Sequence, residues 1–348
     1  MRWKGWDHVS IDPATGQVIG ADGDPGIQPV DAIAPAIISA SRSTDIPALY
    51  GDWFMERMKT GYATWTSPWN GRIQAVSFAN VRLFVFWSKN PLPFLPALSQ
   101  FRDQDVPFLL LYTLNDYREE DLEPGIPHLD ERIRTFREIS SLAGRGRVTW
   151  RFDPVLLSGT LTVERLLDRI RSIGDQVAGF TDRLVISFID IERYPRVKKN
   201  LGESGVRECT PGEIRSLARG IAAANEDWGL EILACGEETD LSSYGIGRGA
   251  CISYDHIARE FASDRLLGNF LAPPGDPVLL QERRRELKDP GQRSCCGCVV
   301  SKDIGRYTTC IHGCRYCYAT SSAALAKKNY QRYCADRDAG IFHPGIIK

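Results

Sequence analysis

Short apolar runs alternate with polar clusters and amphipathic stretches along most of this chain. Buried strands that alternate with helices in this way are typical of βα units around a parallel sheet. The runs cover residues 36–41, 83–87, 108–113, 148–153, 184–190 and 230–235. The pattern predicts an α/β fold, a single full or partial (β/α) barrel of the TIM type, over residues 33–330.

Local signals also predict where several helices begin and end. Thr44 or Asp45 is a suitable cap for a helix that carries a proline in its first turn and stops at Gly61. Residues 210–213, Thr-Pro-Gly-Glu, form a capping box with proline at the first helical position. Residues 163–173 carry an apolar stripe of helical period, which predicts a helix packed against the sheet.

The two ends of the chain lack the alternating pattern. Residues 1–32 are rich in Gly, Asp and Pro, which favours a loop-rich arm or a small hairpin around Thr15-Gly16. Near the other end, the sequence predicts a seventh strand over 305–308 and a final helix over 319–330. Residues 331–348 are then a C-terminal tail, and the barrel domain includes the cysteine-rich stretch 295–319.

Composition narrows the class of protein. The chain has 348 residues, 43% hydrophobic and 25% charged, which is typical of a soluble globular domain. Its net charge of −1 creates no long-range field that would attract nucleic acid or an anionic membrane. We find no signal-peptide core and no apolar run near the ~20 residues of a membrane span. We therefore expect a cytoplasmic protein without a membrane partner, in which clustered cysteines bind metal more often than they form disulfides.

Six of the ten cysteines lie between residues 295 and 317. Cys310, Cys314 and Cys317 are spaced C-x3-C-x2-C, and three thiolates this close can hold three corners of a [4Fe-4S] cluster. Such a loop leaves one iron open to an outside ligand. The alternative is a structural zinc site, but zinc prefers four ligands, which a lone triplet does not supply.

This three-cysteine pattern resembles the signature of radical S-adenosylmethionine (SAM) enzymes, in which the open iron binds the amino and carboxylate groups of SAM. Tyr316 stands where that family places an aromatic residue against the adenine. In the usual radical-SAM barrel the cysteine loop follows the first strand, whereas here it follows the last predicted one. Joining the chain ends would make the run at 36–41 the second strand, which indicates a circular permutation.

In a parallel barrel the carboxyl ends of the strands line one mouth, where ligands bind. Polar residues that directly follow the predicted strands are therefore candidates for the site. For cofactor binding we assign Tyr316, Ser41, Arg42 and Asn115. For substrate contact or proton transfer we assign Lys89, Asp153 and Glu237. The alternative for each strand-end residue is an ordinary cap or salt bridge.

Several stretches together resemble one uncharacterised bacterial family, domain of unknown function 1848, over about residues 37–319. They are residues 38–47, 86–91, 150–154, 296–299 with 303–305, and 310–319. The chain departs from the family at Ile311, where Pro is usual, and at Ser43, often Arg, and neither change removes a cysteine. The family is similar to the radical-SAM group that includes spore photoproduct lyase, a DNA-repair enzyme. The resemblance implies SAM chemistry without fixing a substrate.

A second set of cysteines also matches cysteine positions of that family: Cys235, Cys251, Cys296 and Cys298. Four thiolates are a complete ligand set for an auxiliary [4Fe-4S] cluster or for an all-thiolate zinc site. Alternatively, Cys235 and Cys251 are small buried apolar residues, as free cysteines often are.

The sequence thus predicts a radical SAM enzyme. In this hypothesis a reduced cluster passes one electron to SAM, and the resulting 5′-deoxyadenosyl radical abstracts hydrogen from a substrate that the sequence does not identify. A one-electron donor such as flavodoxin or ferredoxin is the expected partner. One alternative is a non-catalytic iron–sulfur or zinc sensor, which would bind metal but not SAM. The other is a nucleic-acid repair or modification enzyme, which the absence of a basic excess disfavours.

Overall fold

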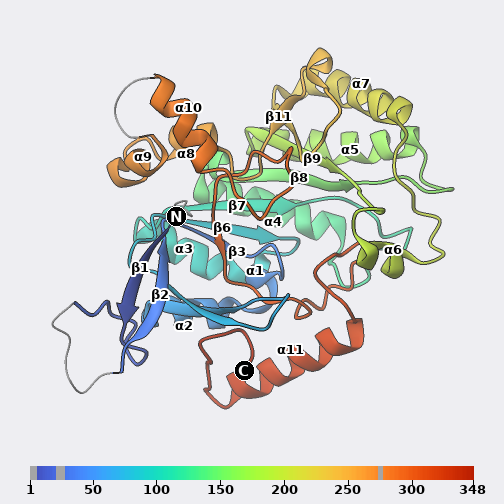
Figure 1. The fold of residues 1–348 in the computed structure, drawn as a ribbon. Helices are drawn as coiled ribbons and strands as arrows, with labels where there is room; N and C mark the ends of the chain where they lie inside the picture. The colour runs from blue at the N-terminus through green and yellow to red at the C-terminus, as the bar shows by residue number, and fades with distance from the viewer. Residues whose placement is uncertain (1–5, 21–27, 273–276) are drawn as a thin grey trace.

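An eight-stranded parallel sheet forms the centre of the protein (Figure 1). The computed structural model describes residues 6–20, 28–272 and 277–348. The strand order is β11-β10-β9-β8-β7-β6-β3-β12, and every neighbouring pair is parallel. The strands are β3 (Ile37–Ala40), β6 (Leu83–Ser88), β7 (Phe108–Thr113), β8 (Val148–Val155), β9 (Arg183–Phe188), β10 (Glu231–Cys235), β11 (Gly247–Gly249) and β12 (Lys302–Asp303). All six predicted apolar runs are strands of this sheet.

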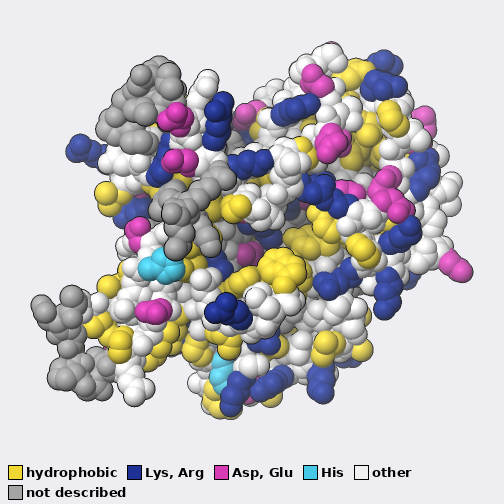
Figure 2. Space-filling model, viewed as in Figure 1, with side chains coloured by type: hydrophobic (Ala, Val, Ile, Leu, Met, Phe, Trp, Pro, Cys, Tyr) yellow, Lys and Arg dark blue, Asp and Glu magenta, His cyan; other side chains and the backbone are white. Residues whose placement is uncertain are grey.

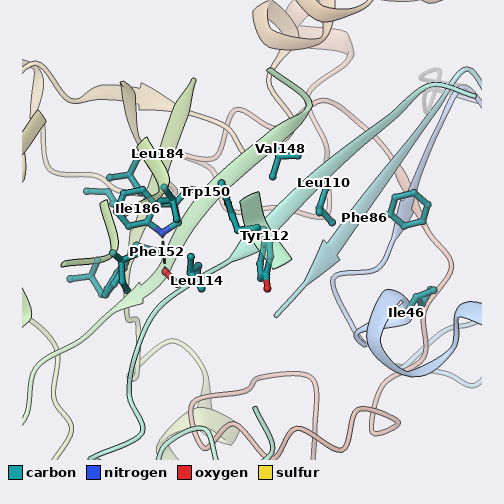
Figure 3. Packing of buried hydrophobic residues seen from close by; sticks show 14 of the residues in the cluster. Ile46, Phe86, Leu110, Tyr112, Leu114, Val148, Trp150, Phe152, Leu184 and Ile186 are labelled. Carbon is teal, nitrogen blue, oxygen red and sulfur yellow. Dashed lines mark hydrogen bonds between the residues drawn. The ribbon is translucent and has the colours of Figure 1, made fainter. Parts of the chain in front are cut away.

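Helices cover one face of the sheet. They are α1 (Ile46–Leu49), α2 (Gly51–Thr60), α3 (Leu95–Asp103), α4 (Leu129–Ala143), α5 (Val163–Val177), α6 (Pro195–Leu201) and α7 (Pro211–Trp228). Alternate strand residues such as Phe86, Tyr112 and Trp150 point into this layer, as the two-residue period of a strand requires (Figure 3). The Trp150 indole N–H donates to the Leu114 carbonyl at 2.8 Å, so its one polar atom is satisfied in the core.

The opposite face is covered by a later part of the chain. Strand residues such as Val85, Leu111 and Leu233 pack there against Leu267 and Val299. This covering part contains α8 (Tyr254–Glu260), α9 (Arg265–Leu271), α10 (Pro277–Glu286) and the irregular segment that leads to β12. Figure 1 shows the three helices grouped at one side of the sheet.

The sheet is open. Within the described residues, the edge strands β11 and β12 are not paired with each other. In a closed barrel the inward side chains fill the interior by themselves. Here apolar side chains from residues 250–271 and 287–300 occupy that face instead. The α/β prediction is confirmed, but closure into a barrel is not.

A smaller sheet stands beside the main one, in the order β1-β2-β5-β4. Its strands are β1 (Trp6–Ile11), β2 (Val30–Pro35), β4 (Tyr62–Thr66) and β5 (Ile73–Ser77). The predicted N-terminal arm therefore contributes strand β1 and the start of β2. After β1 the chain turns where the hairpin was predicted, because Gly16 has a φ of +71° and a Cβ there would lie 1.9 Å from the Thr60 carbonyl oxygen.

The predicted helix signals agree with the structure. Asp45 caps α1 by accepting from the Ala48 N–H at 3.0 Å, and Gly61 ends α2 in the left-handed conformation. The helix is broken at Tyr50, which separates α1 from α2. The capping box of Thr210 and Glu213 opens α7. Short 3-10 helices lie at Leu92–Phe94, Arg145–Arg147, Ala178–Phe180 and Ser242–Tyr244.

Two predictions near the C-terminus are wrong. The seventh strand is β12 at Lys302–Asp303 rather than 305–308, because the Asp303 carboxylate accepts from the Gly305 N–H at 2.8 Å and turns the chain. The last helix is α11 (Ala323–Asp338), capped by Ser322, rather than 319–330. The expected tail boundary at residue 331 therefore falls inside a helix. No described helix is both long and apolar enough to span a bilayer.

Candidate active site and metal centres

The loop between β12 and α11 carries the C-x3-C-x2-C triplet, and we call residues 309–319 the cluster loop. Two backbone bonds join it to the segment after β7: the Gly125 N–H donates to His312 O at 2.8 Å, and the Arg315 N–H donates to Leu122 O at 2.9 Å. A Cβ at Gly125 would lie 2.6 Å from the His312 oxygen, so this approach requires glycine. The cluster loop is thus held against the carboxyl end of the sheet. β12, the strand before the loop, pairs with β3, which comes first along the chain among the strands of this sheet. A circularly permuted barrel would have this neighbour relation.

Cys310, Cys314 and Cys317 keep some exposed surface, but their thiols interact with one another. Burial raises the pKa of Cys310 to about 12 and that of Cys314 well above its usual value. Among the described residues, Cys235, Cys296 and Cys298 have sulfur atoms that all lie within 4.8 Å of one another, whereas the three sulfur atoms of the cluster loop do not. Thiolates on separate irons of one cluster lie farther apart than thiolates on one ion. The cluster loop therefore fits a cluster better than a single ion.

Three of the predicted site residues meet beside this loop around Glu123. The Lys89 ammonium donates to Asn115 Oδ1 at 2.9 Å and to Glu123 Oε1 at 2.7 Å. The Tyr316 hydroxyl donates to the same carboxylate, and its ring centroid lies 5.4 Å from Lys89 Nζ. Both Lys89 and Glu123 interact electrostatically with the Cys314 thiol, so this group adjoins the cluster loop.

Glu123 is charged at neutral pH although its side chain is only 2% exposed. Burial alone would raise the pKa of Glu123, but the charges of Lys89 and Arg132 and the bonds it accepts lower it overall. A buried carboxylate with this many donors is a fixed negative charge. Together with Lys89 it presents one charge of each sign next to the cysteines.

A buried carboxylate–imidazole pair lies at the base of the cluster loop. His312, between the first two cysteines, lies with Nε2 2.9 Å from Asp45 Oδ2. Asp45 also accepts from the Ser88 hydroxyl at 2.7 Å and from the Lys89 N–H at 2.8 Å. Burial would raise the pKa of Asp45, and the His312 contact and these donors lower it. The pair therefore connects the cluster loop to α1 and to the end of β6.

The hydroxyl of Ser41 is engaged in holding β12. It donates to Asp303 Oδ1 at 3.0 Å, and the backbone N–H of Arg42 donates to Oδ2 at 2.6 Å. Ser43 donates to the same carboxylate at 3.0 Å. Asp303 thus accepts hydrogen bonds from three residues of the turn after β3. In this arrangement Ser41 acts as an ordinary cap at a strand end, the alternative to cofactor binding named above.

Arg42 and Asp153 belong to a different group, centred on Trp87. The guanidinium of Arg42 lies 5.3 Å from the Trp87 ring centroid and pairs with Asp289 at 3.2 Å. Arg151 lies 4.7 Å from the same ring and pairs with Asp153. Both arginines also interact with thiols of the second cysteine set.

Glu237 does not join Lys89. It accepts from the Thr239 N–H at 2.9 Å and interacts with Cys209. In the open sheet β10 and β6 are separated by β9, β8 and β7, which is about 19 Å at ~4.8 Å per strand. The expected convergence of all strand ends assumed a closed barrel, and the role of Glu237 in substrate contact or proton transfer stays a prediction.

The second cysteine set is assembled as the sequence predicted. Cys235, Cys296 and Cys298 are buried with their sulfur atoms within 4.8 Å of one another, and Cys251 makes side-chain contacts with Cys235 and Cys298. All four thiols are free. This group can hold a metal.

Sequence reasoning missed four residues of these sites: Glu123, Asp45, His312 and Asp303. Asp45 was recognised only as a helix cap, and His312 could have been found from its place between two cysteines. Glu123 lies in an irregular segment ten residues beyond the end of β7. No local pattern marks it, because its partners come from other strands.

A search of curated proteins finds no match to this chain. Among solved structures, a ligand-free type DHODH from Eimeria tenella is similar, with 12% identity over 90% of this chain and 88% of that one. Its TM-score of 0.26 is too low to support any argument about fold or function. The family described as "Domain of unknown function (DUF1848)" matches residues 37–319. This match covers most of the chain, including both cysteine sets, and the protein therefore belongs to the DUF1848 family.

Proposed function

We propose that this protein is a radical SAM enzyme that binds a [4Fe-4S] cluster through Cys310, Cys314 and Cys317. One observation carries the proposal: the three-cysteine loop meets a buried charged group, Lys89 with Glu123, at the carboxyl edge of a parallel sheet. Ligands of parallel α/β proteins bind at this edge.

The donor set suits a cluster with one open iron. The cluster loop supplies three thiols whose sulfur atoms do not all lie within 4.8 Å of one another. Burial raises the pKa of the Cys310 and Cys314 thiols, and metal binding would stabilise their thiolate forms. When bound, such a cluster supplies one electron to SAM, which then gives methionine and a 5′-deoxyadenosyl radical that abstracts hydrogen from substrate.

The residues around the cluster loop would bind and orient SAM. SAM carries an ammonium, a carboxylate and a sulfonium, and the Lys89–Glu123 pair offers a charge of each sign beside the loop. Tyr316 contributes an aromatic ring, for which the family resemblance implies adenine contact, and Asn115 holds Lys89 in place. These groups are largely buried, which keeps water from the reacting atoms.

Within this proposal Asp45 and His312 position the loop. Their contact at 2.9 Å fixes the imidazole between the first two cysteines, and Ser88 and the Lys89 backbone hold the carboxylate in turn. Ser41 acts on the same loop through Asp303 and β12. We also propose that a flavodoxin or ferredoxin supplies the electron that reduces the cluster. The enzyme then acts on a substrate that neither the sequence nor the fold identifies.

The charge pattern gives no support to the nucleic-acid alternative. On the face seen in Figure 2, basic and acidic side chains are interspersed. Binding to a phosphate backbone requires a continuous basic surface.

The test is anaerobic reconstitution with iron and sulfide, followed by electron paramagnetic resonance of the reduced protein with and without SAM. We expect a cluster signal that changes on adding SAM, together with 5′-deoxyadenosine production. Cys314→Ala should abolish both, while Cys334→Ala, a half-buried cysteine of α11, should leave both intact. A signal that does not respond to SAM, with no 5′-deoxyadenosine, would refute the enzyme and favour the non-catalytic sensor.

A further inference from the structure

A second group of thiols lies on the covered face of the sheet, and we call it the tetrathiol group. It consists of Cys235, Cys251, Cys296 and Cys298, each at most 8% exposed. Cys235 ends β10 and Cys251 follows β11, at one edge of the sheet. The other two precede β12, which forms the opposite edge. Three separate parts of the chain thus meet at one buried point.

The distances between the sulfur atoms distinguish a single ion from a cluster. Cys235 Sγ and Cys296 Sγ are 4.0 Å apart, and both lie within 4.8 Å of Cys298 Sγ. Four thiolates around one tetrahedral ion, each about 2.3 Å from the metal, lie about 3.8 Å from one another. In a cluster each thiolate binds its own iron and sulfide ions lie between the irons, so the cysteines must be farther apart.

We propose that Cys235, Cys251, Cys296 and Cys298 bind one tetrahedral metal ion of the zinc type rather than a second iron–sulfur cluster. Cys251 contacts two of the other thiols but is not within 4.8 Å of all three, so it is the ligand that moves inward when the ion binds. The proposal is independent of the radical-SAM function, because it uses none of the residues of the cluster loop.

The surroundings of the tetrathiol group suit a negatively charged metal complex. One divalent ion with four thiolates carries two negative charges, which are costly to bury without compensation. The Arg151 guanidinium is close enough to Cys251 and Cys235, and the Arg42 guanidinium close enough to Cys298, to interact with thiolate charge. The backbone N–H of Ile252 donates to Cys298 Sγ at 3.5 Å. Such contacts around the ligands stabilise a metal site.

The position of the ion indicates what it does. It would crosslink the β10–β11 edge to the segment that leads into β12, and so hold that segment on the face of the sheet. Among the described residues, the Val299 N–H joins the two parts by donating to Ile252 O at 2.9 Å, whereas the bond from the Asp289 N–H to Cys298 O at 2.9 Å lies within the segment itself. A metal bond at this point therefore fixes the segment from which β12 and the cluster loop continue.

The experiment uses the full chain with the triple substitution Cys310→Ala, Cys314→Ala and Cys317→Ala, so that only the tetrathiol group can bind metal. After anaerobic purification, zinc, iron and sulfide are measured, and the ion is then exchanged for Co²⁺. We expect about one zinc per chain, no iron, and the cobalt absorption of a tetrahedral all-thiolate site. Adding Cys298→Ser should remove the zinc and these bands, whereas adding Cys295→Ser, the neighbouring cysteine outside the group, should not.

Two results would overturn the proposal. Roughly four irons with sulfide per chain in the triple variant would identify an auxiliary cluster. Failure to bind either Zn²⁺ or Co²⁺ would show that the thiols are only core residues. If Cys298→Ser does not fold, the triple variant without this change still distinguishes one tetrahedral ion from a cluster or from no metal. Its cobalt spectrum and its hydrogen exchange provide the two readouts. Removing the ion with a chelator should speed exchange in residues 287–303, and unchanged exchange there would refute the crosslinking role.

Discussion

The ion pair between Lys89 and Glu123 should make a large contribution to stability, which the substitution Glu123→Gln measures. The two side chains are 15% and 2% exposed, and their charged atoms are 2.7 Å apart. At an effective dielectric constant of ~20, unit charges at this distance attract by about 6 kcal/mol. Desolvation of both groups offsets part of this energy, but removing one partner leaves the other charge buried and unpaired, which costs about 3–5 kcal/mol. We expect Glu123→Gln to lower the free energy of unfolding by about 3 kcal/mol.

The measurement is equilibrium unfolding of the metal-free protein in denaturant at pH 7, as a double-mutant cycle. Lys89→Met and the double variant complete the cycle, and we expect a coupling energy of at least ~1.5 kcal/mol. Glu119→Gln is a matched control in the same segment, because its side chain is 69% exposed and its pairs are on the surface. It should cost less than ~1 kcal/mol. A loss below ~1 kcal/mol for Glu123→Gln, or no coupling to Lys89, would refute the description of this pair as buried and mutually dependent.

Three further predictions test other parts of the structure. Burial, then the charge of Arg183, lowers the pKa of His256 to about 3. Its imidazole is therefore neutral in the fold but protonates near pH 6.5 when unfolded, so the unfolding free energy should fall below pH 6.5 by up to about 1.4 kcal/mol per pH unit. Equilibrium unfolding in denaturant at several pH values checks this. The same slope of the unfolding free energy against pH in His256→Gln would contradict it. Gly305→Ala should destabilise by about 2 kcal/mol, because its Cβ would lie 1.9 Å from the Ser41 hydroxyl. The same unfolding assay should find Gly268→Ala, with nothing within 4 Å of the added Cβ, neutral or stabilising, and the reverse order would refute the close packing at residue 305. Asp45→Asn should speed iron loss from the reconstituted protein to a chelator, since it weakens the contact that orients His312, and an unchanged rate would show that this contact does not hold the loop.

Elements that depend on local sequence could be predicted. The six apolar runs became strands because an uninterrupted run of buried residues between turn signals has few other stable conformations. Likewise, the helix start at Thr210 and the helix end at Gly61 follow from capping chemistry within a few residues. The grouping of Cys235, Cys296 and Cys298 was also predicted, because the family resemblance singled out these positions among the ten cysteines.

Closure of the sheet could not be predicted in the same way. It depends on whether the inner face is filled by the strands themselves or by another part of the chain. Residues 250–271 and 287–300 cover that face through two short helices and irregular segments, and such short elements do not mark in the sequence which face of the sheet they will cover. The expected convergence of Lys89 and Glu237 at one mouth depended on that closure, and so on packing between distant parts of the chain.

The shortest strand of the sheet connects the two candidate metal centres. β12 has only two residues and pairs with β3 at Lys302 and Asp303, so backbone pairing alone gives it little stability. It lies four residues after Cys298 and seven before Cys310. The Asp303 carboxylate accepts further bonds from the turn after β3, and Cys296 and Cys298 of the tetrathiol group lie on the other side of β12 along the chain. A metal ion in the tetrathiol group would therefore stabilise β12 and, through it, the geometry of the cluster loop. This arrangement gives a physical reason for placing Cys296 and Cys298 directly ahead of the strand that leads into the cluster loop.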